Sequence, residues 1–213
     1  MEILRGFSHL NHASIKIERD QVIYIDPFQI EGAPHDADII FCTHDHSDHL
    51  NPDAIKKVMK GNTVIVVPRK NVKKFKKFEL KEIIGVEPNN EYSANGIKFK
   101  TVPAYNVDKK FHKKKKNWVG YILTLDNADF YFAGDTDYIP EMDDIKADVV
   151  FIPVGGVYTC NAVEAARAVN AIKPKVAVPI HFGSVVGTKD DARTFIENLD
   201  QGIEGVILMK EEK

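Results

Sequence analysis

Short apolar runs recur along the chain and are separated by turn residues, which is the pattern of buried strands in a sheet. The run VIYID at residues 22–26, for example, is rich in β-branched and aromatic residues and ends at Pro27. In the first half the predicted strands are residues 22–26, 37–42 and 63–68, then a segment that alternates through Ile97, Phe99 and Thr101 after an Asn95-Gly96 turn.

Helical patterns interrupt these strands in a few places. Asn51 can cap a helix that has Pro52 at its first position and ends at Gly61. Apolar residues fall at helical intervals in residues 161–174, and residues 190–200 predict another helix. The strands predicted in the second half lie in residues 118–137, around an Asp126-Asn127 turn, and at residues 147–156, 175–183 and 205–210.

Strands inside and helices outside indicate a layered α/β or α+β domain. The chain has 213 residues, of which 44% are hydrophobic, so it is long enough to bury one large core. No linker divides it, and its halves share only a loose order of strands, a polar loop and a helix. We therefore expect a single domain over residues 1–213.

Charge and composition narrow the class of protein. The 29 basic and 31 acidic residues give a formal net charge of -2, which demands neither a nucleic-acid partner nor a membrane partner. The N-terminus lacks the apolar run of a signal peptide, and no stretch approaches the roughly 20 apolar residues that cross a bilayer. Cysteine is limited to Cys42 and Cys160, which favours a reducing compartment over a disulfide scaffold. We expect a cytoplasmic protein.

A dense group of histidines and aspartates follows residues 37–42. It contains His44, His46, Asp48 and His49, spaced as H-x-H-x-D-H. His44 and His46 can point the same way from an extended loop, whereas adjacent residues tend to point apart, so each pair can bind its own cation. Imidazole nitrogen and carboxylate oxygen suit zinc, iron or manganese. A solvated loop with capping aspartates would explain neither the density nor the spacing.

Three further polar residues end apolar runs elsewhere in the chain. They are Asp26 in YIDPF, Asp135 in FAGDTD and His181 in VPIHFG. Proteins built on sheets often place functional groups at the carboxyl ends of strands, and a carboxylate at Asp135 could bridge two ions. The structural alternatives are a turn cap for each aspartate and a buried, hydrogen-bonded role for His181.

This ordered set resembles the metallo-β-lactamase superfamily, and the likeness covers nearly the whole chain. The segments LNHASIKIE, IDPF, VPAYN, GDTDYIPEM and PIHFG are most similar to a branch of metal-dependent hydrolases related to L-ascorbate-6-phosphate lactonase. The resemblance implies an α+β fold, a four-layer αββα sandwich with a dinuclear metal site. It also implies two divalent ions, with Zn²⁺ first and Mn²⁺ or Fe²⁺ as alternatives.

Carried onto this chain, the ligands are His44 and His46 at the first ion, Asp48, His49 and His181 at the second, and Asp135 as the bridge. Asp26 is expected behind the ligands, where it accepts an N–H from one of the histidines and fixes its tautomer.

The chain departs from the family pattern at one position. Most members offer a histidine at the end of the strand before the bridging aspartate, but here that strand ends in Tyr105-Asn106. The only histidine between His49 and Asp135 is His112. The first site is therefore completed by His112, by the amide oxygen of Asn106 or by water.

Two cations that share a water lower its pKa toward about 7, so hydroxide can attack a carbonyl carbon or a phosphorus at neutral pH. We expect a hydrolase that uses such a metal-bridging hydroxide on a small anionic ester or lactone. The alternatives are a phosphodiesterase or nuclease acting on nucleic acid, and a metal-binding protein without turnover. A chain of 213 residues leaves little room for nucleic-acid recognition arms. Nothing calls for a membrane partner, and a homo-oligomer stays open.

Weaker candidates complete the expected site. His12 matches a histidine that lies near the site in this branch; it is a proton donor, a support for a ligand or an ordinary strand histidine. We expect it to take part in the reaction with Asp48 and Asp135. The run of lysines in residues 108–116 is either a solvated loop or a positive lip for an anionic substrate. Gly155, Gly156, Tyr158 and Thr159 either contact substrate or form a plain turn before the helix.

Overall fold

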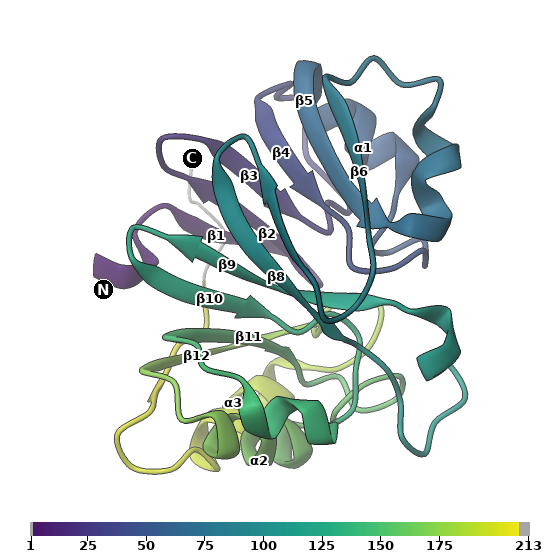
Figure 1. Ribbon diagram of the computed structural model, residues 1–213. Helices are drawn as coiled ribbons and strands as arrows, with labels where there is room; N and C mark the ends of the chain where they lie inside the picture. The colour runs from purple at the N-terminus through teal and green to yellow at the C-terminus, as the bar shows by residue number, and fades with distance from the viewer. Residues whose placement is uncertain (1, 209–213) are drawn as a thin grey trace. The chain divides into compact units, whose positions relative to one another are not determined.

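The computed structural model describes residues 2–208, which divide into two compact units, each with its own sheet (Figure 1). The first unit takes residues 2–87, 93–96 and Leu208 of the described chain, and the second takes residues 88–92 and 97–207. Within residues 2–208, no helix has both the length and the apolar content that crossing a bilayer requires.

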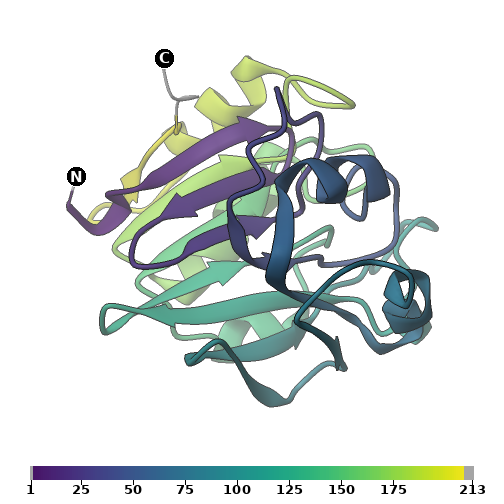
Figure 2. The ribbon, with the colours of Figure 1, turned by 90° about the horizontal axis from the view of Figure 1, so that it is seen from above.

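The first unit is built on a six-stranded sheet in the order β1-β2-β3-β4-β5-β6. The strands are β1 (Phe7–Asn11), β2 (Ser14–Glu18), β3 (Val22–Ile25), β4 (Ala37–Phe41), β5 (Met59–Pro68) and β6 (Glu82–Val86). β1, β2 and β3 are antiparallel neighbours, drawn in purple in Figure 2, and β3 to β6 run parallel. The helix α1 (Pro52–Val58) connects β4 to β5, and the short 3-10 helices are η1 (Glu2–Leu4) and η2 (Arg69–Phe75).

The second unit carries most of a seven-stranded sheet in the order β13-β12-β11-β10-β9-β8-β7, and the division between the units falls within β7. The strands are β7 (Glu91–Ala94), β8 (Ile97–Pro103), β9 (Val119–Leu125), β10 (Ala128–Phe132), β11 (Val149–Pro153), β12 (Val176–Ile180) and β13 (Glu204–Gly205). β8, β9 and β10 are antiparallel, whereas β10 to β13 run parallel. The helices are α2 (Ala162–Ile172), α3 (Lys189–Glu197), η3 (Lys114–Lys116) and η4 (Pro140–Asp144).

Each unit packs its helices against one face of its sheet. Ile55 of α1 joins Ile40 of β4 in the apolar core of the first unit. In the second unit α2 and α3 lie next to each other (Figure 1), and Val169 and Phe195 share a core with Ile152 of β11. The apolar stripe of each helix therefore covers the alternating apolar residues of the strands beneath it.

Strand direction decides where the polar residues gather. Parallel strands bring their carboxyl ends to one edge of a sheet, which is where binding residues commonly lie. In the first unit Asp26 follows β3 and the histidine cluster follows β4, its parallel neighbour. In the second unit Asp135 follows β10, Gly155 follows β11 and His181 follows β12. Each unit thus collects its candidate residues at one edge of its own sheet.

The turn predictions are confirmed by backbone angles. Asn95 and Gly96 have φ values of 45° and 85°, and Asp126 and Asn127 have φ values of 50° and 62°. Positive φ at both central residues is the requirement of a type I′ hairpin, which Asn and Gly meet at low cost. The N-cap prediction is also confirmed, because Asn51 Oδ1 accepts the Ala54 N–H at 2.9 Å.

Two predicted ends are wrong. The helix that was expected to end at Gly61 ends at Val58, because Met59 already has an extended backbone and starts β5. The closing strand expected over residues 205–210 is short, since β13 covers Glu204–Gly205 only and residues 209–210 lie outside the described part. The α+β class with two sheets is confirmed, and the single-domain organisation stays a prediction.

Candidate metal centre

The first pair of predicted ligands converges in the first unit. His44 Nε2 and His46 Nδ1 lie 3.1 Å apart, and their rings meet edge to face with centroids 4.7 Å apart. His44 is buried, with 1% of its surface exposed. Two imidazole nitrogens that meet in this way can bind a single cation, as the H-x-H spacing predicts.

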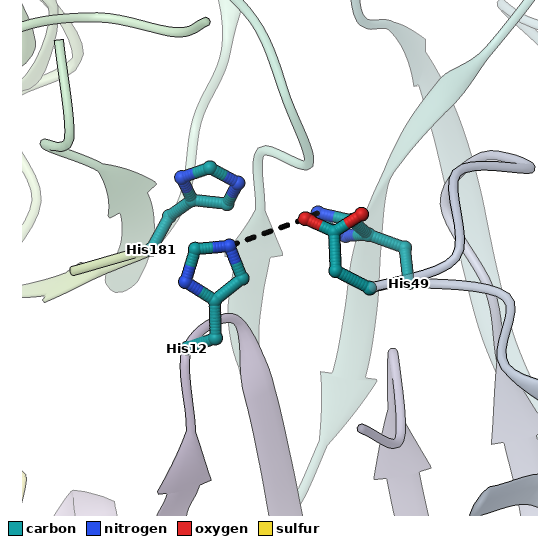
Figure 3. Close-up of side chains that lie close together, drawn as sticks. His12, His49 and His181 are labelled. Carbon is teal, nitrogen blue, oxygen red and sulfur yellow. Dashed lines mark ion pairs between the residues drawn. The ribbon is translucent and has the colours of Figure 1, made fainter. Parts of the chain in front are cut away.

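A second group in the first unit combines His12, Asp48 and His49, with donor atoms that lie within 4.8 Å of one another. Asp48 Oδ2 is 3.3 Å from His12 Nε2 and 3.6 Å from His49 Nε2, and Figure 3 shows the two histidines with the ion pair of His12 dashed. The expectation that Asp48 and His49 point apart is wrong. The chain turns at this point, with the His49 N–H donated to His46 O, so both side chains reach the same place.

A carboxylate and a hydroxyl lie behind these histidines. Asp26 Oδ2 is 2.7 Å from His49 Nδ1 and accepts the Thr43 hydroxyl at 2.7 Å, while Asp26 Oδ1 accepts the Thr43 N–H at 2.7 Å. The Thr43 oxygen also lies 3.0 Å from His44 Nδ1. Because the hydroxyl proton goes to Asp26, that oxygen accepts the N–H of His44. One carboxylate thereby favours a proton on Nδ1 of both histidines and leaves a lone pair on each Nε2.

The second unit places Asp135 between two histidines. Asp135 Oδ2 lies 3.2 Å from His112 Nε2 and 3.1 Å from His181 Nε2. Asp135 is 4% exposed, and both histidines are 1% exposed. His112 is therefore buried beside the predicted bridging carboxylate rather than exposed among the lysines.

Asn106 and Tyr158 hold His112 in place. Asn106 Oδ1 accepts the backbone N–H of His112 at 2.8 Å and lies 3.2 Å from its Nδ1. The Tyr158 carbonyl lies 3.2 Å from the same Nδ1 and accepts the Asn106 amide at 2.8 Å. Two oxygen acceptors at Nδ1 favour the tautomer that leaves the Nε2 lone pair beside Asp135. The Asn106 oxygen is engaged by His112, so Asn106 supports His112, and His112 Nε2 is the nitrogen that faces Asp135.

Three candidate residues have left-handed backbones, with φ of 52° at His12, 45° at Asp26 and 61° at His181. This conformation costs a non-glycine residue about 1 kcal/mol or more, so each turn is maintained by its surroundings. A Cβ on Gly155 would meet His181 O at 2.6 Å and Val186 Cγ2 at 2.6 Å. Only glycine leaves room there for the backbone that orients His181.

The lysines of residues 108–116 have different surroundings. Lys109 pairs with Asp137 at 2.5 Å, Lys114 pairs with Glu141 at 2.8 Å, and Lys116 lies over the Trp118 ring. Lys110 and Lys113 are exposed on either side of His112. The run is therefore partly anchored and only partly available to a ligand.

Neither cysteine is suited to metal binding. Burial raises the pKa of the Cys42 thiol well above its usual value, and the nearby Asp26 charge raises it further. Burial likewise raises the pKa of Cys160. Both are free thiols, and a thiol that resists ionisation is a poor ligand. The donors are therefore imidazole nitrogens and carboxylate oxygens, a set that fits Zn²⁺, Mn²⁺ or Fe²⁺.

Thr43 and Asp137 were missed by the sequence reasoning. Thr43 directly precedes His44, and Asp137 is the second aspartate of GDTD. Each is buried and touches a residue that supports a histidine. A polar residue next to a candidate ligand was the available signal.

Residues 7–181 match the beta-lactamase superfamily domain. The chain belongs to this superfamily. A UPF0173 metal-dependent hydrolase of Pyrococcus horikoshii is 31% identical, and the alignment covers 93% of this chain and 94% of that protein. A proposed metal-dependent hydrolase of Parabacteroides distasonis, known from a crystal structure, is 32% identical with a TM-score of 0.82, covering 96% of this chain and 93% of its own. A metallo hydrolase of Ignicoccus hospitalis reaches a TM-score of 0.78 at 21% identity, covering 97% and 95% of the two chains, which shows the fold alone.

These likenesses confirm the predicted metallo-β-lactamase fold and the predicted class, a metal-dependent hydrolase. The branch related to L-ascorbate-6-phosphate lactonase stays a prediction. So do the choice of metal, the substrate and the role of each residue at the site.

Proposed function

We propose that this superfamily member hydrolyses a small anionic ester or lactone with two divalent metal ions bound to its histidines and aspartates. The observation that carries the proposal is that each unit gathers histidine nitrogens and a carboxylate at one edge of its sheet. In both units a carboxylate lies beside histidine nitrogens, and oxygen acceptors hold the opposite ring nitrogens of His44, His49 and His112.

Both units contribute metal ligands in this proposal. A structural zinc ion takes four protein ligands and a catalytic one takes three with an open position. His44 and His46 alone do not reach three, and His112 and His181 share the single carboxylate of Asp135. The proposed ligands are His44, His46, Asp48 and His49 in the first unit and His112, Asp135 and His181 in the second.

The ions, when bound, supply Lewis-acid polarisation of the scissile group and an activated water at neutral pH. The protein's part is to hold the ligands without rearrangement during the reaction. Asp26 and Thr43 fix His44 and His49 in the tautomer that ligation needs. His12, whose Nε2 is 3.3 Å from Asp48, is the proposed donor of a proton to the leaving group.

An anionic substrate is favoured by the charge beside His112. Lys110 and Lys113 are exposed on either side of it and add positive potential there. Lys109 and Lys114 add less, because Asp137 and Glu141 neutralise them at close range. Such a field raises the local concentration of anions and weakens as salt screens it.

The test is hydrolysis by zinc-loaded protein of matched neutral and anionic lactones, esters and phosphodiesters. We expect turnover of an anionic lactone or ester, and we expect Asp135→Ala and His181→Ala to lose it while keeping their circular dichroism. A double change of Lys110 and Lys113 to alanine should raise KM for the anionic substrate more than for the neutral one. Cleavage of oligonucleotides alone would instead support the nuclease alternative, and metal binding without any turnover would support a non-catalytic role.

A further inference from the structure

His112 belongs to a long connection and not to a strand. The chain leaves β8 at Pro103 and enters β9 at Val119, with only the short η3 between them. This segment also contains the whole lysine run of residues 108–116, whose side chains favour water. A ligand on such a loop is positioned only as well as the loop itself is anchored.

The anchor of the loop begins at Asn106. Besides the contacts of its oxygen with His112, its backbone N–H is donated to His112 O at 2.6 Å. Its amide nitrogen donates to Asp137 Oδ1 at 3.0 Å. Asn106 therefore links Asp137 by hydrogen bonds to both the backbone and the ring of His112.

Asp137 is a buried carboxylate, 2% exposed, that receives donors mainly from this loop. Oδ1 accepts from Asn106 and from Lys109 Nζ at 2.5 Å, and Oδ2 accepts the Val107 N–H at 2.9 Å. Burial opposes a charge on Lys109, but the hydrogen bond to Asp137 and the charges of Asp137 and Glu164 outweigh it and raise the pKa of Lys109. The ammonium is therefore retained opposite the carboxylate.

Asp137 also lies two residues after Asp135 in the turn that follows β10, and its backbone N–H is donated to Tyr105 O at 3.0 Å. The same turn thus carries the predicted bridging carboxylate and the anchor of the histidine beside it. A turn held by these hydrogen bonds can keep the separation of His112 and Asp135 constant.

We propose that Asp137 is a positioning residue for the metal ligand His112, acting through Asn106 and balanced by Lys109. The inference rests on the proposed function, since it assumes that His112 binds a metal ion. It gives three residues outside the proposed ligand set a defined role in metal affinity.

Asp137→Asn is the informative variant because it preserves shape and removes the acceptor pattern. The carboxylate accepts from donors on both oxygens, whereas an asparagine must turn its own NH₂ toward one of them. If that NH₂ replaces Oδ1, it faces the Asn106 amide and Lys109. If it replaces Oδ2, it faces the Val107 N–H. In both cases two hydrogen-bond donors oppose each other. The loop should shift, and His112 with it.

The experiment titrates metal-free protein with Co²⁺ and follows its visible absorption, with Zn²⁺ competition as a second measure. We expect Asp137→Asn to weaken one of the two binding events by about 10- to 100-fold, the effect typical of losing a group that supports a ligand. His112→Ala should weaken the same event, and the double variant should be little worse than His112→Ala alone. The ¹⁵N shifts of His112 in metal-free protein should also change in Asp137→Asn.

Asp148→Asn is the matched control, since Asp148 accepts a backbone N–H from Asp129 and pairs with Lys175 in the same unit without contacting the loop. It should leave both binding events unchanged. If Asp137→Asn does not fold, Lys109→Gln tests the anchor from the loop side and should weaken the same event. Loss in His112→Ala but normal binding in Asp137→Asn or Lys109→Gln would overturn the inference alone. A wild-type protein that binds no Co²⁺ or Zn²⁺ would overturn the proposed function as well.

Discussion

Thr43→Val tests whether the hydroxyl behind the histidine cluster sets the state of His44. The substitution keeps the β-branched shape and removes one oxygen from a residue that is 1% exposed. It deletes the bond donated to Asp26 at 2.7 Å and the contact with His44 Nδ1 at 3.0 Å. The Thr43 backbone N–H and His49 still bind Asp26, so the carboxylate keeps its place.

The expected magnitude follows from the two bonds. A bond to a charged acceptor contributes about 1.5–3 kcal/mol and a neutral one about 1 kcal/mol. The His44 N–H would also lose this acceptor in a buried setting. We expect the free energy of unfolding of metal-free protein to fall by about 2–4 kcal/mol. Zinc affinity should fall by about 10- to 100-fold, because the tautomer of His44 is no longer fixed.

The assay is zinc titration against a chromophoric chelator, paired with urea unfolding of the metal-free protein. Thr63→Val is the matched control in the same unit. Thr63 is fully buried, donates to Ala37 O at 2.6 Å and accepts the Lys60 N–H at 2.9 Å. It belongs to β5 and not to the histidine cluster that follows β4. It should lose similar stability and keep its zinc affinity. Equal zinc affinity in wild type and Thr43→Val would refute the reasoning.

Three further predictions follow from the same geometry. Gly155→Ala should lower metal content, measured by elemental analysis, because its Cβ would overlap His181 O and Val186. The control Gly61→Ala, whose Cβ would enter open space, should keep its metal content. A normal metal content in Gly155→Ala would show that His181 tolerates the shift. Chelation of the metal should lower Tm, since ion binding at 1,000 times Kd stabilises the folded state by about 4 kcal/mol; an unchanged Tm in scanning calorimetry would argue against bound ions. The Lys175 partner and the Asp129 N–H lower the pKa of Asp148. The ionised Asp148 therefore stabilises the fold above its unfolded pKa of about 3.9, and this stabilisation is lost as the pH falls through the lower folded pKa. Acid unfolding of Asp148→Asn should lack this component, and a pH profile identical to that of the wild type would contradict the prediction.

Many strands and the turns could be predicted from the sequence because their signals are local, whereas β1, β2 and β6 were not predicted. β4 is a short apolar run with flanking polar residues, and the Asn95-Gly96 turn has the residues that positive φ requires. The end of α1 was not accessible in the same way. Nothing local stops a helix at Val58, but pairing of Met59 with Ala37 places the chain in β5. Sheet pairing between distant segments overrides helix preference there.

The site was predictable where the ligands are dense and less so where support comes from a distance. The H-x-H-x-D-H spacing indicated metal chemistry without any structure. The contact between His112 and Asn106 depends on the loop conformation, because it is made by side-chain atoms that no periodicity describes. Asp137 was missed for a similar reason, since its partners Val107 and Lys109 are set by the folded loop. The convergence of Asp48 with His49 likewise depends on a turn of the backbone.

The measurement that tests the central claim most directly is the metal content of protein purified with metal and freed of loosely bound ions. Elemental analysis should approach two equivalents per chain, and both Asp135→Ala and His181→Ala should fall well below that value. A wild-type stoichiometry that stays near one would contradict the dinuclear assignment. A value of zero, with the fold intact, would contradict the proposed metal centre altogether.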